Sequence, residues 1–323
     1  MTAGRAPLRL MTLALLTFTA LAVSGCQQQK VEPVLVKRWD RMRSDIKARL
    51  AADRLAAGQL DAAAGEVRDA RRLDPENPDL VLLDARVALA QGRVEYAERV
   101  LAEARGDAAT RAQVAYLQGV IDQNRQRWDE ALLSFQRASG LHPGKVEYLL
   151  AEVEALLQLG RSAEALERLR SRERDFGWMT PFLSALAECH EQLDAWADAA
   201  ATWRRVTGAD TTDAHARARL ALALHRAGQS AEAVTLLDEL CGGADATDVL
   251  RLALAACLLD VGQAARAAEH LMPIVQADPS NRTALVLMAR AHAAQGRLPA
   301  ALRVAQRVIE LDSQGVSGFE LAA

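Results

Sequence analysis

The stretch YLQGVIDQNRQRWDEALLSFQRASGLHP, residues 116–143, decides the fold of this chain. Its apolar residues recur at helical spacing on both sides of a polar segment, which predicts two amphipathic helices joined by a short turn. Pro143 at its end cannot continue a helix. Parts of the same skeleton return at 58–75, 92–104, 160–169 and 296–308, so the helix pair is a repeating unit.

The repeat has a period of 34 residues and holds its register from Ser44 onward. In rows of this length, one column is alanine in all eight rows, and the residue four positions later is apolar in each. The alanines are Ala63, Ala97, Ala131, Ala165, Ala199, Ala233, Ala267 and Ala301. An alanine and an apolar residue one helical turn apart form one face. We therefore expect this column to be the place where two helix axes approach closely.

The turn between the two helices has its own column, five residues before the alanine. Glycine occupies it in six of the eight rows, whereas Gln126 and Asp194 occupy it in the other two. Glycine suits a helix end that must adopt a left-handed backbone. We therefore expect the turns at Gln126 and Asp194 either to differ from the others or to carry strain.

This pattern resembles the tetratricopeptide repeat, with glycine at the turn, alanine at position 20, an apolar residue at 24, a small residue at 27 and proline at 32. Residues 116–143 match it at Gly119, Trp128, Ala131, Phe135, Ala138 and Pro143. The resemblance covers 44–315 and implies an all-α fold, a right-handed α-solenoid superhelix of about eight helix pairs with a concave inner surface. It weakens at Arg172, which replaces a small residue, and in three first helices. Asp84, Gln118 and Glu152 stand there where the family prefers leucine.

Composition excludes several classes of protein. Half of the 323 residues are hydrophobic but only 4% are aromatic, which suits close-packed helices better than a β-sandwich. The net charge of −3 and the lack of interleaved basic and aromatic residues give no indication of nucleic-acid binding. Four cysteines are too few for a disulfide scaffold of this length.

The first 25 residues have the layout of a signal peptide, with a basic start, an apolar run from Leu10 to Val23, and small residues before Cys26. The ending Val-Ser-Gly-Cys resembles the lipobox of bacterial lipoproteins. That resemblance implies cleavage before Cys26 and acylation of this residue, so that lipid holds the protein on a membrane. Gln27 is compatible with the outer membrane, which we favour over the inner. The alternatives are an ordinary secretory signal with a chance cysteine, or an uncleaved anchor.

The domain boundaries follow from these two resemblances. Residues 1–25 are the predicted lipoprotein signal peptide, and 26–43 are a lipidated tether followed by an N-terminal extension of the first helix. Residues 44–315 hold eight repeats of 34 residues, and 316–323 form a C-terminal tail that covers the last repeat.

The reactive side chains give no catalytic or metal-binding signature. Cys189 and Cys257 share one small, apolar column, which predicts two core thiols too far apart for a disulfide. Cys241 ends a predicted helix, and we interpret it as a structural residue, not as a functional thiol. His190 has no second histidine at helical spacing, so we interpret it as solvated or groove-lining. No metal and no cofactor is expected.

The predicted partner site is the inner groove, because the family resemblance assigns positions 2, 5, 9 and 12 of each first helix to the concave surface. In the middle of the chain those positions form a mixed apolar and acidic strip. The residues we select from it are Tyr116, Leu150, Glu154, Leu157, Glu188, Glu191 and His225. The Lys and Asn of the carboxylate-clamp subfamily are missing from this strip. A guest segment with Leu and Arg or Lys would complement it, and a merely solvated face is the alternative.

These observations predict a protein that is not an enzyme. The leading hypothesis is a lipid-anchored, periplasm-facing scaffold of the bacterial cell envelope. It would bind an envelope protein in the groove, and the membrane through Cys26, and would assist assembly of a secretion, pilus or polysaccharide-export complex. The alternative is a protein that binds a glycan or small molecule, or acts on it, through groove carboxylates. A groove carboxylate with a raised pKa would favour that alternative.

Overall fold

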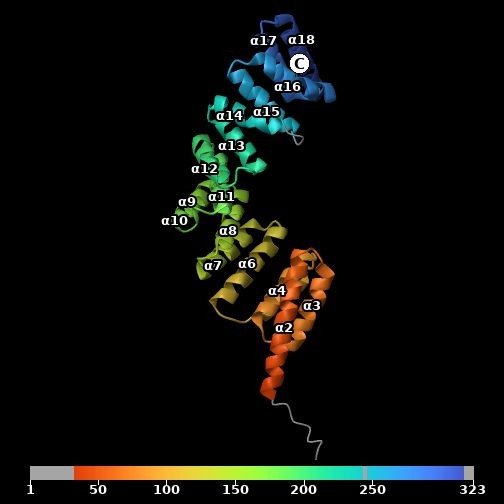
Figure 1. Cartoon of the computed structure of the whole chain (residues 1–323), viewed down its shortest axis with the longest axis vertical. Helices are drawn as coiled ribbons and strands as arrows, with labels where there is room; N and C mark the ends of the chain where they lie inside the picture. Colours follow the sequence, from red (N-terminus) through yellow and green to blue (C-terminus); the bar gives the residue numbers. More distant parts are fainter. Residues whose placement is uncertain (1–32, 243–245, 316–323) are drawn as a thin grey trace, which may run out of the picture. The chain divides into compact units, whose positions relative to one another are not determined.

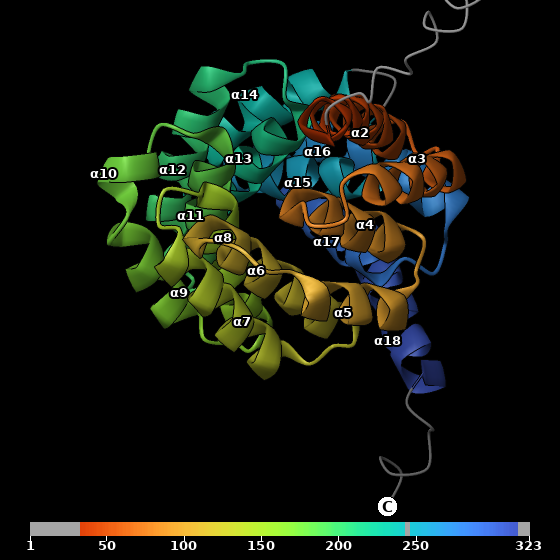
Figure 2. The ribbon, with the colours of Figure 1, turned by 90° about the horizontal axis from the view of Figure 1, so that it is seen from below.

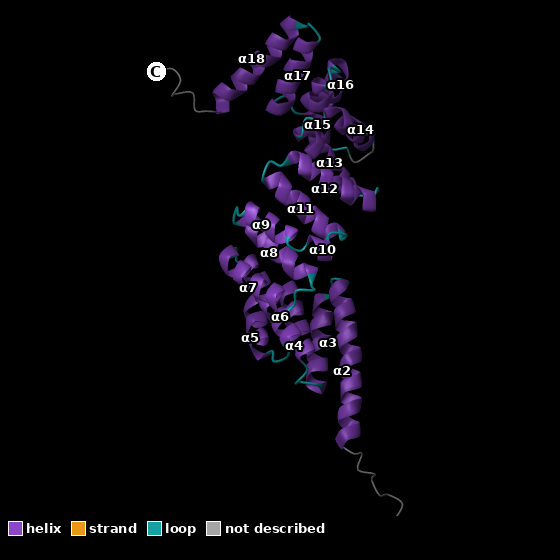
Figure 3. Cartoon of the chain, turned by 90° about the vertical axis from the view of Figure 1, so that its left-hand side faces the viewer, coloured by secondary structure: helices purple, strands orange, loops and turns teal. Residues whose placement is uncertain are grey.

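The computed structural model describes residues 33–242 and 246–315, and every regular element in these ranges is a helix (Figures 1 and 3). The helices are α2 (Pro33–Ala56), α3 (Leu60–Leu73), α4 (Pro78–Ala90), α5 (Val94–Glu103), α6 (Ala108–Asn124), α7 (Trp128–Leu141), α8 (Val146–Gln158), α9 (Ser162–Arg170), α10 (Glu173–Phe176), α11 (Thr180–Gln192), α12 (Trp196–Ala209), α13 (Ala214–Arg226), α14 (Ser230–Cys241), α15 (Asp248–Asp260), α16 (Ala264–Ala277), α17 (Arg282–Ala294) and α18 (Leu298–Gly315). The predicted all-α fold of consecutive helix pairs is confirmed.

The chain divides into two compact units, one ending at Arg105 and the other beginning at Gly106. The described part of the first unit holds α2 to α5, in which α2 packs on α3, α3 on α4 and α4 on α5. The second unit holds α6 to α18, and each helix there packs mainly on its neighbours in the sequence. Seen in Figure 2, the helices of this second unit follow one another around an arc.

The alanine column is the close contact that the repeat predicts. Seven of its eight alanines have no exposed surface, and only Ala301 in the last pair is partly exposed. The residues four positions later are buried in the same seven pairs, including Phe135 and Trp203. An alanine at this place leaves room for the facing helix, because interiors pack without spare volume.

All eight turns have the same left-handed backbone, whatever residue occupies them. The six glycines have φ between 71° and 78°, Gln126 has φ 59° and Asp194 has φ 54°. The hydrogen bonds are also the same: the N–H of Arg127 donates to the Asp122 carbonyl at 2.9 Å, as that of Arg161 does to Leu156 at 2.8 Å. Of the two predicted alternatives, the structure therefore shows strain and not a different turn.

Of the three residues that stand where the family prefers leucine, Asp84 and Glu152 are buried carboxylates with hydrogen-bonding partners. In the first unit, Asp84 accepts hydrogen bonds from Arg71 at 2.6 Å and from the Tyr96 hydroxyl at 3.0 Å. In the second unit, Glu152 is 3% exposed, pairs with Arg168 and accepts from the Ser139 hydroxyl at 2.8 Å. A buried charge is tolerated when it is paired and hydrogen-bonded in this way. Gln118 is exposed instead.

The fourth helix pair is interrupted where Arg172 replaces the small residue. Helix α9 ends at Arg170, and the short α10 follows it. Arg172 lies over the Phe176 ring at 5.2 Å and donates to the Pro143 carbonyl at 2.7 Å. The Arg172 side chain therefore joins the short helix to the turn between α7 and α8.

The cysteine prediction is confirmed and the histidine prediction is wrong. Cys189 and Cys257 are completely buried, and burial raises the pKa of both thiols to about 12, so neither is a ready nucleophile. Cys241 is half-buried, and burial raises its pKa too. His190 is neither solvated nor lining a groove: it is 5% exposed, and burial lowers its pKa.

The predicted signal segment, Cys26 and the tail at 316–323 lie outside the described residues.

Candidate functional site

Four of the seven predicted groove residues line one cavity of about 740 Å³ in the second unit. Leu150, Glu154 and Leu157 come from one face of α8, because residues spaced by three and four lie above one another on a helix. Glu188 comes from α11, the first helix of the next pair, and Arg219 reaches the cavity from α13. The remaining lining includes Val153, Gln158, Pro181, Ser184, Ala185 and Gln192.

The cavity carries two carboxylates beside apolar surface. Glu154 is exposed and accepts a hydrogen bond from the Gln123 amide at 3.1 Å. Glu188 is half-buried, and burial raises the pKa of its carboxyl. The charges of Glu191 and Glu154 raise this pKa further, while the Arg219 guanidinium opposes them. The negative charges of Glu154 and Glu188 repel each other, and both would attract a cation bound in the cavity.

Glu191 stands beside the cavity in an ion pair. Its carboxylate pairs with the Arg219 guanidinium and accepts a hydrogen bond from the Trp203 indole N–H at 2.6 Å. Arg219 also stacks over the Trp203 ring at 5.6 Å. The role of Glu191 is therefore to hold Arg219 at the wall of the cavity, and its own oxygens already have partners.

Tyr116 and His225 lie elsewhere on the second unit. Tyr116 joins an aromatic cluster, with its ring 5.7 Å from that of Phe135 and 5.1 Å from that of Tyr148. Neither Tyr116 nor His225 lines the cavity. The predicted strip therefore concentrates between α8 and α11, in the fourth and fifth helix pairs.

His225 belongs to a small polar cluster farther along the chain. Its Nδ1 is 3.3 Å from the Ser230 hydroxyl and 3.4 Å from the Asp260 carboxylate. The hydroxyl itself donates to Asp260 at 3.0 Å and is buried. Because its proton already points at a carboxylate, Ser230 is not arranged as a nucleophile activated by His225.

Sequence reasoning missed Arg219. Its column is mixed, with alanine or leucine in six repeats and arginine in two, at Arg49 and Arg219. The column therefore gave no signal that singled out Arg219 as part of the site.

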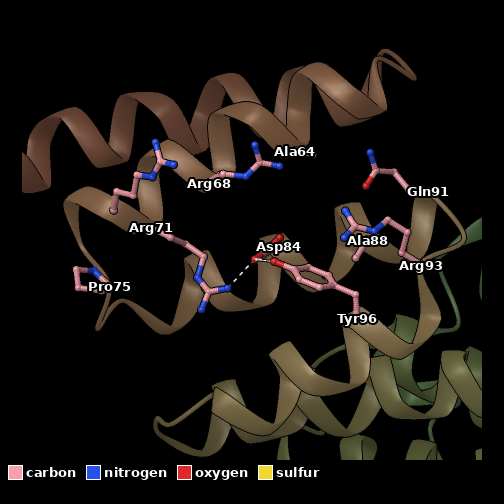
Figure 4. A pocket seen from close by; sticks show the side chains of 10 residues that line it. Ala64, Arg68, Arg71, Pro75, Asp84, Ala88, Gln91, Arg93 and Tyr96 are labelled. Atoms are coloured by element: carbon pink, nitrogen blue, oxygen red, sulfur yellow. Dashed lines mark hydrogen bonds and ion pairs between the residues drawn. The ribbon is translucent and has the colours of Figure 1, made fainter.

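A second cavity, of about 300 Å³, lies in the first unit and is lined by four arginines (Figure 4). Arg71 donates to Asp84 and to Glu103, each at 2.6 Å, and Arg93 lies 4.5 Å over the Tyr96 ring. The other two arginines are Arg68 and Arg72. This cavity offers donors to an anion, but its least exposed arginine is already committed to two carboxylates. No predicted groove residue lines it.

The described ranges hold neither a metal-binding cluster nor a membrane-spanning helix. No group of His, Cys, Asp and Glu side chains there is arranged to hold a metal ion. No helix of residues 33–242 and 246–315 has the length and apolar character needed to cross a membrane.

Comparisons with known proteins agree on the repeat. One family model described as tetratricopeptide repeat matches residues 54–121 and 258–315, and a second with that description matches 116–175 and 184–249. No curated protein matches the chain.

Solved structures of the same kind are similar in fold. The pilF protein of Pseudomonas aeruginosa is 18% identical, with a TM-score of 0.53 over 62% of this chain and 92% of its own. MamA from Desulfovibrio magneticus RS-1 is 17% identical, with a TM-score of 0.48 over 52% of this chain and 95% of its own. YrrB, described as a TPR protein with an unusual peptide-binding site, is 14% identical, with a TM-score of 0.49 over 55% and 91%. At these identities the likeness concerns the fold alone.

Proposed function

The chain belongs to the tetratricopeptide-repeat family, and we propose that it is a lipid-anchored scaffold of the bacterial cell envelope. Its repeat architecture is that of a protein–protein interaction scaffold, in which stacked helix pairs present an extended binding surface. The observation that carries the proposal is the cavity between α8 and α11, where apolar and acidic side chains converge.

The chemistry of this cavity suits a partner segment that carries leucine and a basic residue. Leu150 and Leu157 offer apolar surface, while Glu154 and the half-buried Glu188 offer negative charge. Burial, together with repulsion from Glu191 and Glu154, raises the pKa of Glu188, and a bound Lys or Arg would favour the charged form of its carboxyl. Burial of the apolar part supplies affinity, and the charges supply register and selectivity.

The lipid anchor rests on the sequence around Cys26, which resembles a lipobox and follows a signal-peptide layout. An envelope protein as partner follows from this anchor, and so does a role in assembling a secretion, pilus or polysaccharide-export complex. Gln27 after the cysteine favours the periplasmic face of the outer membrane.

The proposal is tested by mild cross-linking in the native cells, followed by purification through a C-terminal tag and mass spectrometry. Glu154→Lys reverses a charge inside the cavity. Glu130→Lys makes the same change on the exposed face of α7, outside the cavity, and serves as the matched control. A stoichiometric envelope protein that is recovered with wild type and with Glu130→Lys, but not with Glu154→Lys, is the expected result. Equal recovery of the partner with wild type, Glu130→Lys and Glu154→Lys would show that the partner does not bind in this cavity.

One observation favours the second candidate, a glycan- or small-molecule-binding or catalytic groove. Glu188 is a carboxylate with a raised pKa, and Glu154 lines the same cavity. The test is thermal denaturation with a panel of soluble cell-wall glycan fragments. A rise in melting temperature that Glu188→Gln abolishes, in a preparation without a protein partner, would favour this candidate over the scaffold.

A further inference from the structure

Helix α2 has two apolar faces, and only one of them is covered. Ala51 is completely buried against α3, with Ala48 and Leu55 beside it. The other face is an exposed stripe with side chains spaced by three or four residues, which places them along one side of the helix. Its members and their exposed fractions are Leu35 54%, Trp39 60%, Met42 49%, Ile46 65% and Leu50 39%.

The position of α2 at the start of the array explains why half of this stripe is exposed. Ile46 and Leu50 correspond, four repeats later, to Phe182 and Leu186, which are buried in α11 where it packs on α9 and α8 of the preceding pair. No described helix precedes α2. The other half, from Leu35 to Met42, continues the stripe along the part of α2 that extends beyond α3 in Figure 3.

Basic side chains flank the stripe. Helix α2 carries seven Lys or Arg side chains against three Asp. Lys47 and Arg54 pair with Glu66 of α3, on the covered face. The remaining five are exposed; Arg43 forms an ion pair with Asp40 at 3.7 Å, and Asp45 lies one helical turn from Arg41 and from Arg49. Of the five, Arg38, Arg43 and Arg49 lie beside the stripe, whereas Lys37 and Arg41 lie on the side of α2 that is turned away from it.

We propose that the stripe of α2 lies on an anionic phospholipid surface, with Trp39 at the level of the headgroups. An amphipathic helix with apolar residues on one side and Lys or Arg along its flanks inserts in this way, and Trp favours the interface. The inference rests on the lipid anchor of the proposed function. Seven residues from Cys26 to Pro33 span at most about 25 Å, so an acylated Cys26 keeps the start of α2 at the membrane.

A second copy of the chain suits this stripe less well. Pairing two α2 helices would bring their basic flanks together, and like charges repel. Another exposed apolar stripe, formed by Leu298, Leu302 and Ile309 on α18, offers no excess of acidic side chains, because Glu310 on this helix is paired with Arg307. A membrane with anionic lipid complements both the apolar surface and the charge.

The test measures where Trp39 lies in the anchored protein. The full chain is purified from membranes and reconstituted into vesicles of anionic or neutral phospholipid whose acyl chains carry bromine, which quenches tryptophan emission. Trp39→Phe removes the reporter, while Trp178→Phe removes a tryptophan of the second unit that is more exposed, at 77%, and is the control. We expect quenching on anionic vesicles that Trp39→Phe abolishes and Trp178→Phe leaves unchanged. The charge-reversed Arg38→Glu/Arg49→Glu form should be quenched less on anionic vesicles only.

Two outcomes would overturn the inference while leaving the anchor intact. One is a protein that floats with the vesicles but shows quenching independent of Trp39. The other is a dimer, detected by light scattering in detergent, that Ile46→Asp dissociates, because a second copy would then cover the stripe. If the protein does not float with the vesicles at all, the lipid anchor fails, and the membrane contact of α2 fails with it.

Discussion

Replacing Gln126 by glycine should stabilise the second unit. The structure holds this residue at φ 59°, in the left-handed region. There the Cβ of an L-residue approaches the following carbonyl oxygen, at a cost of roughly 1–2 kcal/mol. Gln126 is exposed, so its side chain gives little burial in return. The substitution removes that strain and leaves the turn unchanged, because six other turns of the array already use glycine.

The expected gain is smaller than the strain itself. Glycine loses more backbone freedom on folding than other residues do, at roughly 0.5–1 kcal/mol. The net increase in the free energy of unfolding should therefore be about 0.5–1 kcal/mol. For a unit of this size it corresponds to a rise in melting temperature of about 1–4 °C. Thermal and urea denaturation followed by circular dichroism measure both quantities.

Two other variants check the reasoning. Asp194→Gly should gain less than Gln126→Gly, because aspartate tolerates the left-handed region better. Gly160→Ala should lose about 0.5–1 kcal/mol, because the strain of the left-handed backbone exceeds what is gained from the smaller backbone freedom of alanine. Its Cβ would meet nothing within 4 Å, so the loss would come from backbone conformation alone. If Gly160→Ala is destabilising while Gln126→Gly leaves the melting temperature unchanged or lowers it, the argument that the Gln126 turn stores strain is refuted.

The remaining predictions concern packing, anchoring and pH. Ala131→Leu should cost about 1–3 kcal/mol by overpacking a fully buried helix contact, and an unchanged melting temperature would show that the contact is not close. Cys26→Ser should release the protein from the membrane fraction, whereas a variant that still sediments with membranes would contradict the lipobox. Because the folded pKa of Glu188 is raised, its contribution to stability is present below its unfolded pKa and is lost as pH rises through the folded value. Glu188→Gln should therefore stabilise the protein at pH 7 and not at pH 4, as melting curves at the two values would show. The lowered pKa of His190 means that the folded state resists protonation, so wild type should lose stability as pH falls below about 6.5, and His190→Gln should lose less.

The fold was predictable because a repeat presents each position to the same surroundings many times. One alanine in a helix says little, but eight in register define a contact, and seven of them are completely buried. The same argument located the turns and the two residues, Gln126 and Asp194, at which the turn carries strain. Where a residue differs from the others in its column, the repeat does not indicate which side chain it will contact. It did not show that Asp84 would pair with Arg71, or that His190 would be buried.

The site was predictable only in part, for a related reason. Column positions indicate which face a side chain occupies, and Leu150, Glu154, Leu157 and Glu188 do meet in one cavity. Column positions do not indicate which neighbouring side chains form hydrogen bonds or ion pairs with a predicted site residue. The Glu191 carboxylate is not available to a ligand, because it already accepts hydrogen bonds from Arg219, twenty-eight residues later, and from the indole N–H of Trp203. Such pairings are specific to one place in the array, so no other repeat repeats the signal.

Glu188 connects the stability of this protein to its proposed function. A half-buried carboxylate beside a second one lowers the free energy of unfolding at neutral pH, and the fold would be more stable with glutamine there. A catalytic acid or a binding site for a cation would each account for such a residue, but they differ in what Glu188→Gln does. For a scaffold that holds a basic segment, the variant should melt at a higher temperature and retain less partner, since the charge that destabilises the free protein is the charge that attracts the guest. A variant that is more stable and retains its partner fully would separate Glu188 from partner binding.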